Sequence, residues 1–192
     1  MTRRRLLVFG AGLLAALGLW QLGGAGAIHA KAALAQVLLE RSWTRSLEGA
    51  AQPRPWPWAD TYPVARLAVP ELGIDEIVLA GANGRSLTFG PAHLAGTAAP
   101  GEAGHAILTG HRDTHFTFLR DLRPGQEIRV QRPDGGWRGY RVVETAVIDA
   151  RHARLAQRDD GTSLTLVTCY PFDAVEPGGP LRYLIYAEAA TR

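Results

Sequence analysis

Short runs rich in β-branched, aromatic and leucine residues recur along the chain from Tyr62 onward, each ended by turn residues. They occupy residues 64–69, 74–79, 105–109, 127–131, 137–148, 163–168 and 181–187. The segment 133–136, Pro-Asp-Gly-Gly, is typical of a hairpin turn because glycine accepts a positive φ. Seven or eight short strands at this spacing predict an all-β sandwich or barrel, with one helical turn over residues 116–122.

The N-terminal residues add a second constraint. Arg3, Arg4 and Arg5 precede residues 6–28, a run of 23 residues without charge. At about 1.5 Å per residue, such a helix crosses a hydrocarbon core of roughly 30 Å, so the run predicts a transmembrane anchor. The arginines place residues 1–5 in the cytoplasm and the rest of this single-pass chain outside the inner or plasma membrane. A cleaved signal peptide is the alternative, and it gives the same topology.

Residues 29–60 are interpreted as an amphipathic helix followed by a spacer. Apolar residues recur at helical spacing up to Leu47, and three prolines in residues 52–58 then end the helix. This proline-rich stretch is typical of a semi-rigid, extended linker. Trp56 and Trp58 either cap the folded domain or lie at the membrane interface. Residues 61–190 would then form the folded domain.

Charge and cysteine content exclude several classes of protein. The chain has 21 Lys and Arg against 18 Asp and Glu, a net charge of +3. The three N-terminal arginines account for this excess, so the remaining chain is neutral and no nucleic-acid partner is expected. A single cysteine excludes an intramolecular disulfide framework and a cysteine-rich zinc site. No cofactor is expected.

The single cysteine, Cys169, ends a strand-like run that Tyr170-Pro171 terminates at once. A thiol at a strand end beside a loop is held by rigid backbone and stays accessible, as a nucleophile requires. A small buried hydrophobe is the alternative for a lone cysteine. His111 follows Gly110 at the end of another apolar run. Near the thiol, its imidazole would favour the thiolate and protonate a departing amine.

Three further interpretations concern charged and metal-binding roles. His111 alone is equally consistent with a surface histidine bonded to its neighbours. His111 and His115 have the i, i+4 spacing of helical zinc ligands, but no intervening Glu or third ligand is evident, so no metal site is predicted. Arg182 begins the last strand, thirteen residues after Cys169. If the two strands are neighbours, its guanidinium can stabilise the oxygen charge that forms when a thiolate attacks a carbonyl.

These residues together resemble the sortase family of membrane-anchored cysteine transpeptidases over about residues 61–190. Residues 164–169, Leu-Thr-Leu-Val-Thr-Cys, are similar to the family's TLxTC signature. Residues 109–114, Thr-Gly-His-Arg-Asp-Thr, are similar to its histidine segment. With Phe116 and Leu119 after this segment, the chain most resembles the class D and class E branches and the single sortases of Gram-negative bacteria.

The resemblance implies an eight-stranded β-barrel with short helices and assigns roles to residues. Cys169 would attack the Thr–Gly peptide bond of an LPxTG-like sorting motif. His111 would act as general acid and then as general base, and Arg182 would stabilise the oxyanion or hold the substrate backbone. The thioacyl-enzyme would pass its acyl group to an amine. Thr109 and Thr168, which flank the reactive side chains, are expected to line the substrate groove.

The resemblance also implies partners: a secreted protein with a C-terminal sorting signal, an amine acceptor in the cell envelope, and membrane lipid around the N-terminal helix. The loops 147–160 and 173–180 are expected to select the motif. Some family members bind calcium, but the adjacent pair Asp159-Asp160 supplies too few oxygen ligands to predict a calcium site.

Three alternatives remain open or are weighed against the sequence. A cysteine protease or amidase, which hydrolyses the acyl-enzyme with water, needs the same nucleophile, acid and oxyanion support. A cell-wall L,D-transpeptidase has a His-Gly-Cys arrangement, whereas Val167-Thr168 precedes Cys169. The non-enzyme alternative is a membrane-tethered β-domain that binds an envelope partner and in which Cys169 is structural.

Overall fold

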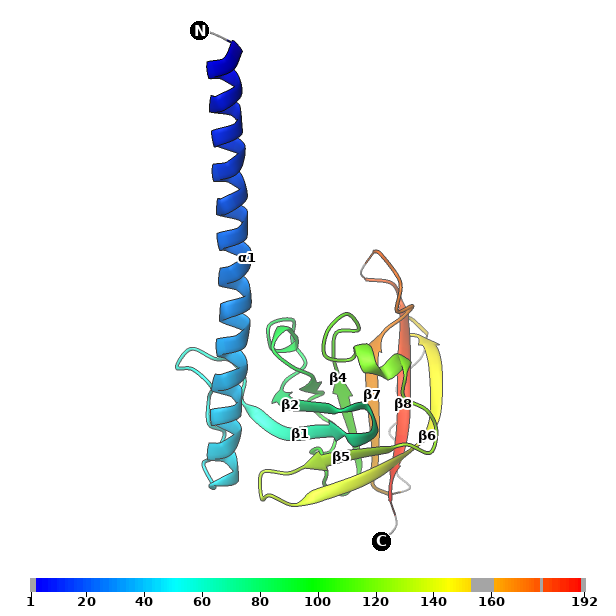
Figure 1. The fold of residues 1–192 in the computed structure, drawn as a ribbon. Helices are drawn as coiled ribbons and strands as arrows, with labels where there is room; N and C mark the ends of the chain where they lie inside the picture. The colour runs from blue at the N-terminus through cyan, green and yellow to red at the C-terminus, as the bar shows by residue number, and fades with distance from the viewer. Residues whose placement is uncertain (1–2, 153–160, 177, 191–192) are drawn as a thin grey trace. The chain divides into compact units, whose positions relative to one another are not determined.

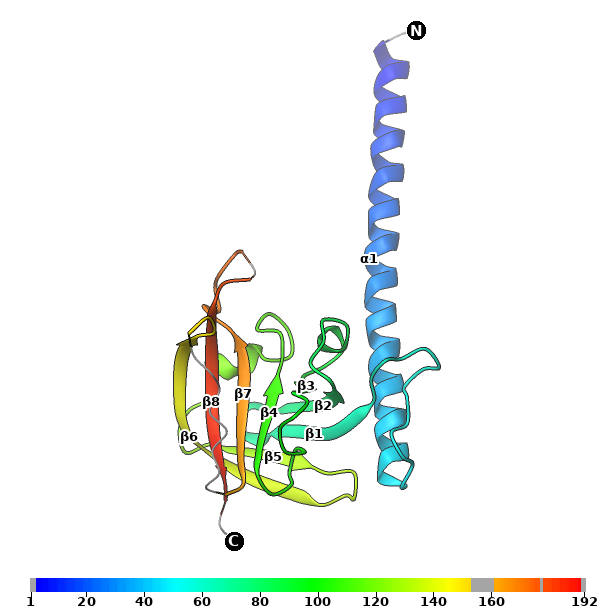
Figure 2. The same cartoon turned by 180° about the vertical axis from the view of Figure 1, so that it is seen from behind.

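The computed structural model describes residues 3–152, 161–176 and 178–190. The chain divides into two compact units after Val37. A helix, α1 (Arg3–Leu47), comes first and is followed by strands and short 3-10 turns (Figures 1 and 2). The strands are β1 (Pro63–Val69), β2 (Ile74–Ala80), β3 (Ala92–His93), β4 (His105–Thr109), β5 (Glu127–Gln131), β6 (Trp137–Asp149), β7 (Ser163–Cys169) and β8 (Leu181–Ala189). The 3-10 turns are η1 (Pro70–Leu72), η2 (Ser86–Thr88) and η3 (Thr117–Arg120).

The eight strands found in the described residues form a closed barrel in the order β1-β2-β3-β4-β7-β8-β6-β5. Pairing of β5 with β1 joins the two ends of the sheet and decides for a barrel over a sandwich. The 13-residue β6 is long enough to pair with both β5 and β8. All seven predicted strands are confirmed, and the predicted helical turn is found as η3. The sequence does not predict β3, because two residues are too few to show alternation.

Alternation of side chains builds the barrel core. On β1 the inward-facing Ala65, Leu67 and Val69 are fully buried, and the residues between them are not. β7 differs, since every residue from Ser163 to Thr168 is buried. It pairs with β4 along one edge and with β8 along the other. Cys169 therefore stands at the end of a strand whose backbone is held on both sides.

The N-terminal run that the sequence predicts as an anchor is helical, as part of the 45-residue α1. Among the described residues, no helix contains a stretch long and apolar enough to cross a membrane.

The last turns of α1 belong to the second unit, with the barrel. Leu39 and Trp43 are buried in a cluster with Ile77, Leu79 and Ala92 of the barrel. This cluster buries apolar surface against the outside of β2 and β3, so the end of α1 is part of the folded domain.

The proline-rich segment after α1 runs over the same unit. Arg45 donates a hydrogen bond to the backbone carbonyl of Arg54 (2.7 Å). Trp56 packs edge-on against Phe89, with ring centroids 5.1 Å apart. Trp58 is 81% exposed. Of the two tryptophans, Trp56 therefore covers part of the domain and Trp58 does not.

Candidate active site

The strand pairing brings the ends of β4 and β7 and the start of β8 to one end of the barrel (Figures 1 and 2). β4 and β7 are parallel, with Thr109 paired to Val167, so both strands end on the same side. His111 follows β4 by two residues, and Cys169 is the last residue of β7. β8 is antiparallel to β7, and the pairing places Arg182 directly opposite Cys169. The predicted role of Arg182 requires that β7 and β8 be neighbours, and they are.

Gly110 links the two strands immediately before both reactive side chains. Its amide donates to the carbonyl of Val167 (3.2 Å), and its carbonyl accepts a hydrogen bond from Oγ1 of Thr168 (2.8 Å). A Cβ at this position would lie 2.8 Å from the ring of Phe116, which is fully buried. Only glycine fits this close approach, and the three contacts fix the backbone from which His111 projects.

Cys169 and His111 line the same small pocket, about 110 Å³ in volume. The segment after β4 supplies His111, Arg112 and Asp113, the end of β7 supplies Cys169, and Tyr170 follows it. Cys169 is a free thiol that is partly exposed, and His111 is exposed. The thiol can therefore be reached from solvent, unlike the fully buried cysteine of the alternative interpretation.

Arg182 is partly buried, and its guanidinium contacts its own loop. Nη1 donates hydrogen bonds to the carbonyls of Gly179 (2.6 Å) and Leu181 (2.8 Å). The register places the side chain beside Cys169, and the loop carbonyls hold one of its nitrogens. To support a charged oxygen at Cys169, the guanidinium would present its remaining donors or exchange these carbonyls for the oxygen.

The two threonines expected to line the groove lie in different environments. Thr109 is half-buried at the end of β4. Thr168 is 2% exposed, and its hydroxyl is committed to the carbonyl of Gly110. Contact of either residue with substrate stays a prediction. The visible role of Thr168 is to connect the strand of the cysteine to the loop of the histidine.

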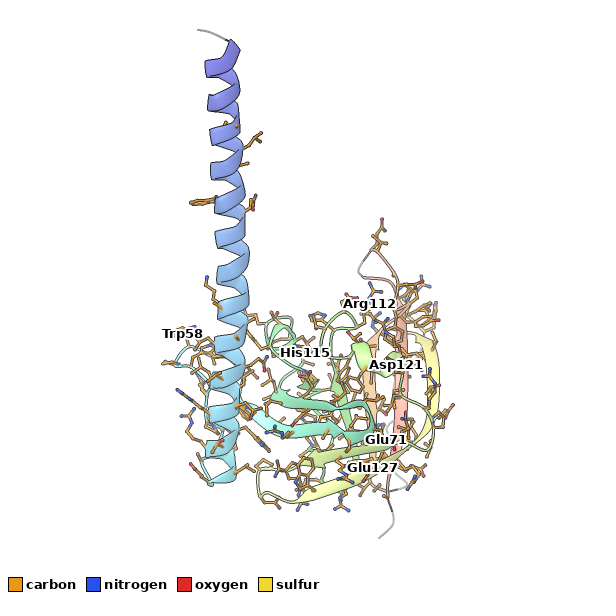
Figure 3. All side chains as sticks on the ribbon, in the orientation of Figure 1. Trp58, Glu71, Arg112, His115, Asp121 and Glu127 are labelled. Atoms are coloured by element: carbon orange, nitrogen blue, oxygen red, sulfur yellow. The ribbon has the colours of Figure 1, made fainter. Side chains whose placement is uncertain are left out.

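Arg112 is a residue of this site that the sequence reasoning does not assign (Figure 3). It is 6% exposed, and its Nη2 donates to the carbonyl of Ala174 (2.6 Å). Nη1 donates to the carbonyl of Pro171, and Nε to Oδ1 of Asp113 (3.0 Å). Its place directly after His111 is the one sequence signal that could have drawn attention to it.

His115 lies apart from a metal-binding arrangement. Residues 112–116 form a turn, so the spacing from His111 to His115 does not put both rings on one helical face. Nδ1 of His115 lies 3.0 Å from Oε2 of Glu76 on β2. Burial lowers the pKa of His115, but the hydrogen bond and the charge of Glu76 outweigh burial and raise it. This pair attaches the histidine segment to β2.

The loops predicted to select the substrate are described in part. Residues 153–160 lie outside the described residues, and with them Asp159 and Asp160; so does residue 177. Within the second loop, Ala174 and Glu176 line the pocket beside Cys169. Val175 between them is 97% exposed.

Comparison with known proteins agrees with this geometry. The family model for the sortase domain matches residues 67–190. Sortase D of Bacillus subtilis (strain 168) is 30% identical over 126 residues, which are 65% of this chain and 63% of that protein. The match thus spans less than two thirds of this relative.

Solved structures show the same fold. Sortase C-1 from Actinomyces oris is 29% identical, with a TM-score of 0.55 over 68% of this chain and 76% of that one. Sortase A from Corynebacterium diphtheriae is 24% identical, with a TM-score of 0.62 over 83% and 86%. A Clostridium perfringens protein described as a Sortase D5 transpeptidase is 24% identical, with a TM-score of 0.60 over 79% and 89%.

Proposed function

The chain belongs to the sortase family, and from this premise we propose that it is a cysteine transpeptidase acting on an LPxTG-like sorting motif. One observation carries the proposal. The register of β4, β7 and β8 brings Cys169, His111 and Arg182 to one end of the barrel. Two of these residues line a pocket open to solvent. A nucleophile, a proton donor and a fixed cation are the groups that acyl transfer from a peptide requires.

The first half of the reaction forms a thioester. The thiolate of Cys169 attacks the carbonyl carbon of the Thr–Gly bond, a C–S bond forms, and the carbonyl oxygen becomes negatively charged. The guanidinium of Arg182 stabilises that charge. When the intermediate collapses, the C–N bond breaks, and the imidazolium of His111 gives its proton to the departing glycine amine.

The second half transfers the acyl group. An incoming amine attacks the thioester while neutral His111 accepts its proton, and the Cys169 thiolate departs. The product is an amide between the sorted protein and an acceptor in the cell envelope. Water in place of the amine would give hydrolysis with the same groups, so the choice of acceptor separates a transpeptidase from a thiol protease.

The chain is further proposed to be held in the inner or plasma membrane by residues 6–28, with the barrel outside. The support is in the sequence, where Arg3, Arg4 and Arg5 precede 23 uncharged residues. The full chain should stay with the membrane fraction after a carbonate wash, and added protease should digest the barrel in spheroplasts. Release of the full chain by the wash would contradict the anchor.

Mass spectrometry tests the chemistry. The protein is incubated with an LPxTG-containing peptide and an amine such as triglycine, and the masses of the products are measured. We expect a transfer product and a thioester adduct on Cys169, and loss of both in Cys169→Ala with unchanged circular dichroism. Hydrolysed peptide alone, with every amine tested, would contradict the transpeptidase. A wild-type yield of transfer product from Cys169→Ala would contradict any role of the thiol.

A further inference from the structure

Arg112 is a buried cation whose three nitrogens all have partners. Its side chain is 7% exposed, and a charge this far from water is kept only when it is well paired. Asp113 supplies the opposite charge, but its side chain is 69% exposed, and Asp113 is the next residue in the chain. The other two partners, the carbonyls of Pro171 and Ala174, lie about sixty residues along the chain. Arg112 therefore joins the segment after β4 to the segment after β7.

The segment that Arg112 holds is one wall of the pocket. We call residues 170–176 the post-cysteine loop, because they follow Cys169 directly. The two carbonyls held by Arg112 lie at the first turn of this loop, where the amide of Ala174 donates to the carbonyl of Pro171 (3.4 Å). Tyr170, Pro171, Ala174 and Glu176 of the loop all line the pocket. The position of the guanidinium thus sets the position of this wall of the pocket.

A second arginine also supports the post-cysteine loop. Arg120, at the end of η3, lies over the ring of Phe172 with its guanidinium carbon 5.5 Å from the ring centroid. Phe172 packs in turn against Tyr183 of β8 (5.2 Å between centroids). These contacts hold the side chain of Phe172, whereas Arg112 holds the backbone of the loop. The backbone contact is the one a neutral or shorter side chain could not reproduce.

The chemistry of the contact requires arginine. Guanidinium presents its donors in a fixed planar fork, so one side chain can bind two carbonyls and a carboxylate at once. A lysine ammonium is a point charge on a flexible stem and would bind fewer of these acceptors at a time.

We propose that Arg112 is a positioning residue for the acyl transfer: it holds the post-cysteine loop so that the pocket beside Cys169 keeps the shape that receives the peptide. This inference rests on the proposed function. Arg112 acts through the loop and not on the reacting atoms, so its loss changes peptide binding more than the reactivity of the thiol.

The test compares Arg112→Gln and Arg112→Lys with a matched control, Arg141→Gln. Arg141 also donates to a loop carbonyl, that of Gly125 (2.8 Å), but lies on β6 and lines no part of the pocket. Five quantities are measured: amide hydrogen exchange of residues 170–176, KM and kcat for the peptide, the rate of alkylation of Cys169 by iodoacetamide, and Tm.

We expect Arg112→Gln to raise exchange in the loop and to raise KM about tenfold or more, since misplacing a substrate-positioning group by about 1 Å costs up to about 100-fold in rate. Alkylation should stay within about twofold of wild type, because His111 and Cys169 are unchanged. Arg112→Lys should not restore KM. Arg141→Gln should leave loop exchange and KM as in wild type.

Three results would overturn the proposal: unchanged loop exchange in Arg112→Gln, increased exchange with wild-type kinetics, or the same KM change in Arg141→Gln. Absence of turnover in the wild-type protein is a different failure. It refutes the proposed function and the positioning role with it, and loop exchange then reports only a structural contact.

Discussion

Replacing Thr168 by valine tests whether the bridge between the two strand ends sets the site. Valine keeps the β-branched shape that suits a strand and exchanges one hydroxyl for a methyl group. It removes the 2.8 Å hydrogen bond from Oγ1 to the carbonyl of Gly110. Both residues are buried, so water does not readily replace the lost donor. The carbonyl adjacent to His111 is left without this partner.

The magnitude follows from burial. A buried acceptor left unsatisfied costs about 1–3 kcal/mol, and we expect Thr168→Val to lose about that much of the free energy of unfolding. Thr168→Ser is the matched control, because it keeps the hydroxyl and removes one methyl group, worth about 0.8 kcal/mol. Thr168→Ser thus loses some stability, less than Thr168→Val, and keeps the bridge that Thr168→Val loses.

Activity separates the two variants. With the bridge lost, the backbone carrying His111 is free to shift relative to Cys169, and we expect kcat/KM for acyl transfer to fall about 10- to 100-fold in Thr168→Val. In Thr168→Ser it should fall less than about threefold. Urea unfolding measures the stabilities, and the peptide assay measures transfer. Equal kcat/KM in the two variants would show that the bridge stabilises the fold without setting the site.

Two further predictions concern the histidine segment. Gly110→Ala places a Cβ 2.8 Å from the ring of Phe116, and we expect a loss of about 1–3 kcal/mol from overpacking, measured by urea unfolding; wild-type stability would refute the close approach. Glu76 raises the pKa of His115 above its ordinary 6.5. The pair therefore stabilises the fold fully below pH 6.5 and loses this contribution as pH rises through the raised pKa. We therefore expect Tm to decline between about pH 6 and 8, and to decline less in Glu76→Gln. An equal decline of Tm in the variant would refute this role of the pair.

The strand pattern of the sequence predicts much of the barrel, and its limits are physical. Runs dense in Val, Leu, Ile and Thr mark seven strands because side-chain alternation and β-branching are local properties. Closure is not local. It depends on pairing between β1 and β5, about sixty residues apart, and no local pattern decides that contact against a sandwich.

The candidate site divides in the same way. Cys169 and His111 can be found from the sequence because one ends a strand, the other closely follows one, and each carries reactive chemistry. Arg112 cannot be assigned in this way, because an arginine beside a histidine in a polar turn is ordinarily a solvent-exposed residue. Its burial results from carbonyls contributed by residues 171 and 174, and those positions depend on the fold.

The reactive residues come from separate parts of the chain, so the register of β4, β7 and β8 is what makes the site. Side chains alternate along a strand, and a slip of one residue in β7 would turn Cys169 to the opposite face and Thr168 toward the pocket. The sheet hydrogen bonds alone resist such a slip weakly at a strand end. Gly110 adds a contact that a slipped strand would lose: its carbonyl accepts a hydrogen bond from the side chain of Thr168. Because this contact lies one residue before each reactive side chain, it fixes the register where an error would separate Cys169 from His111.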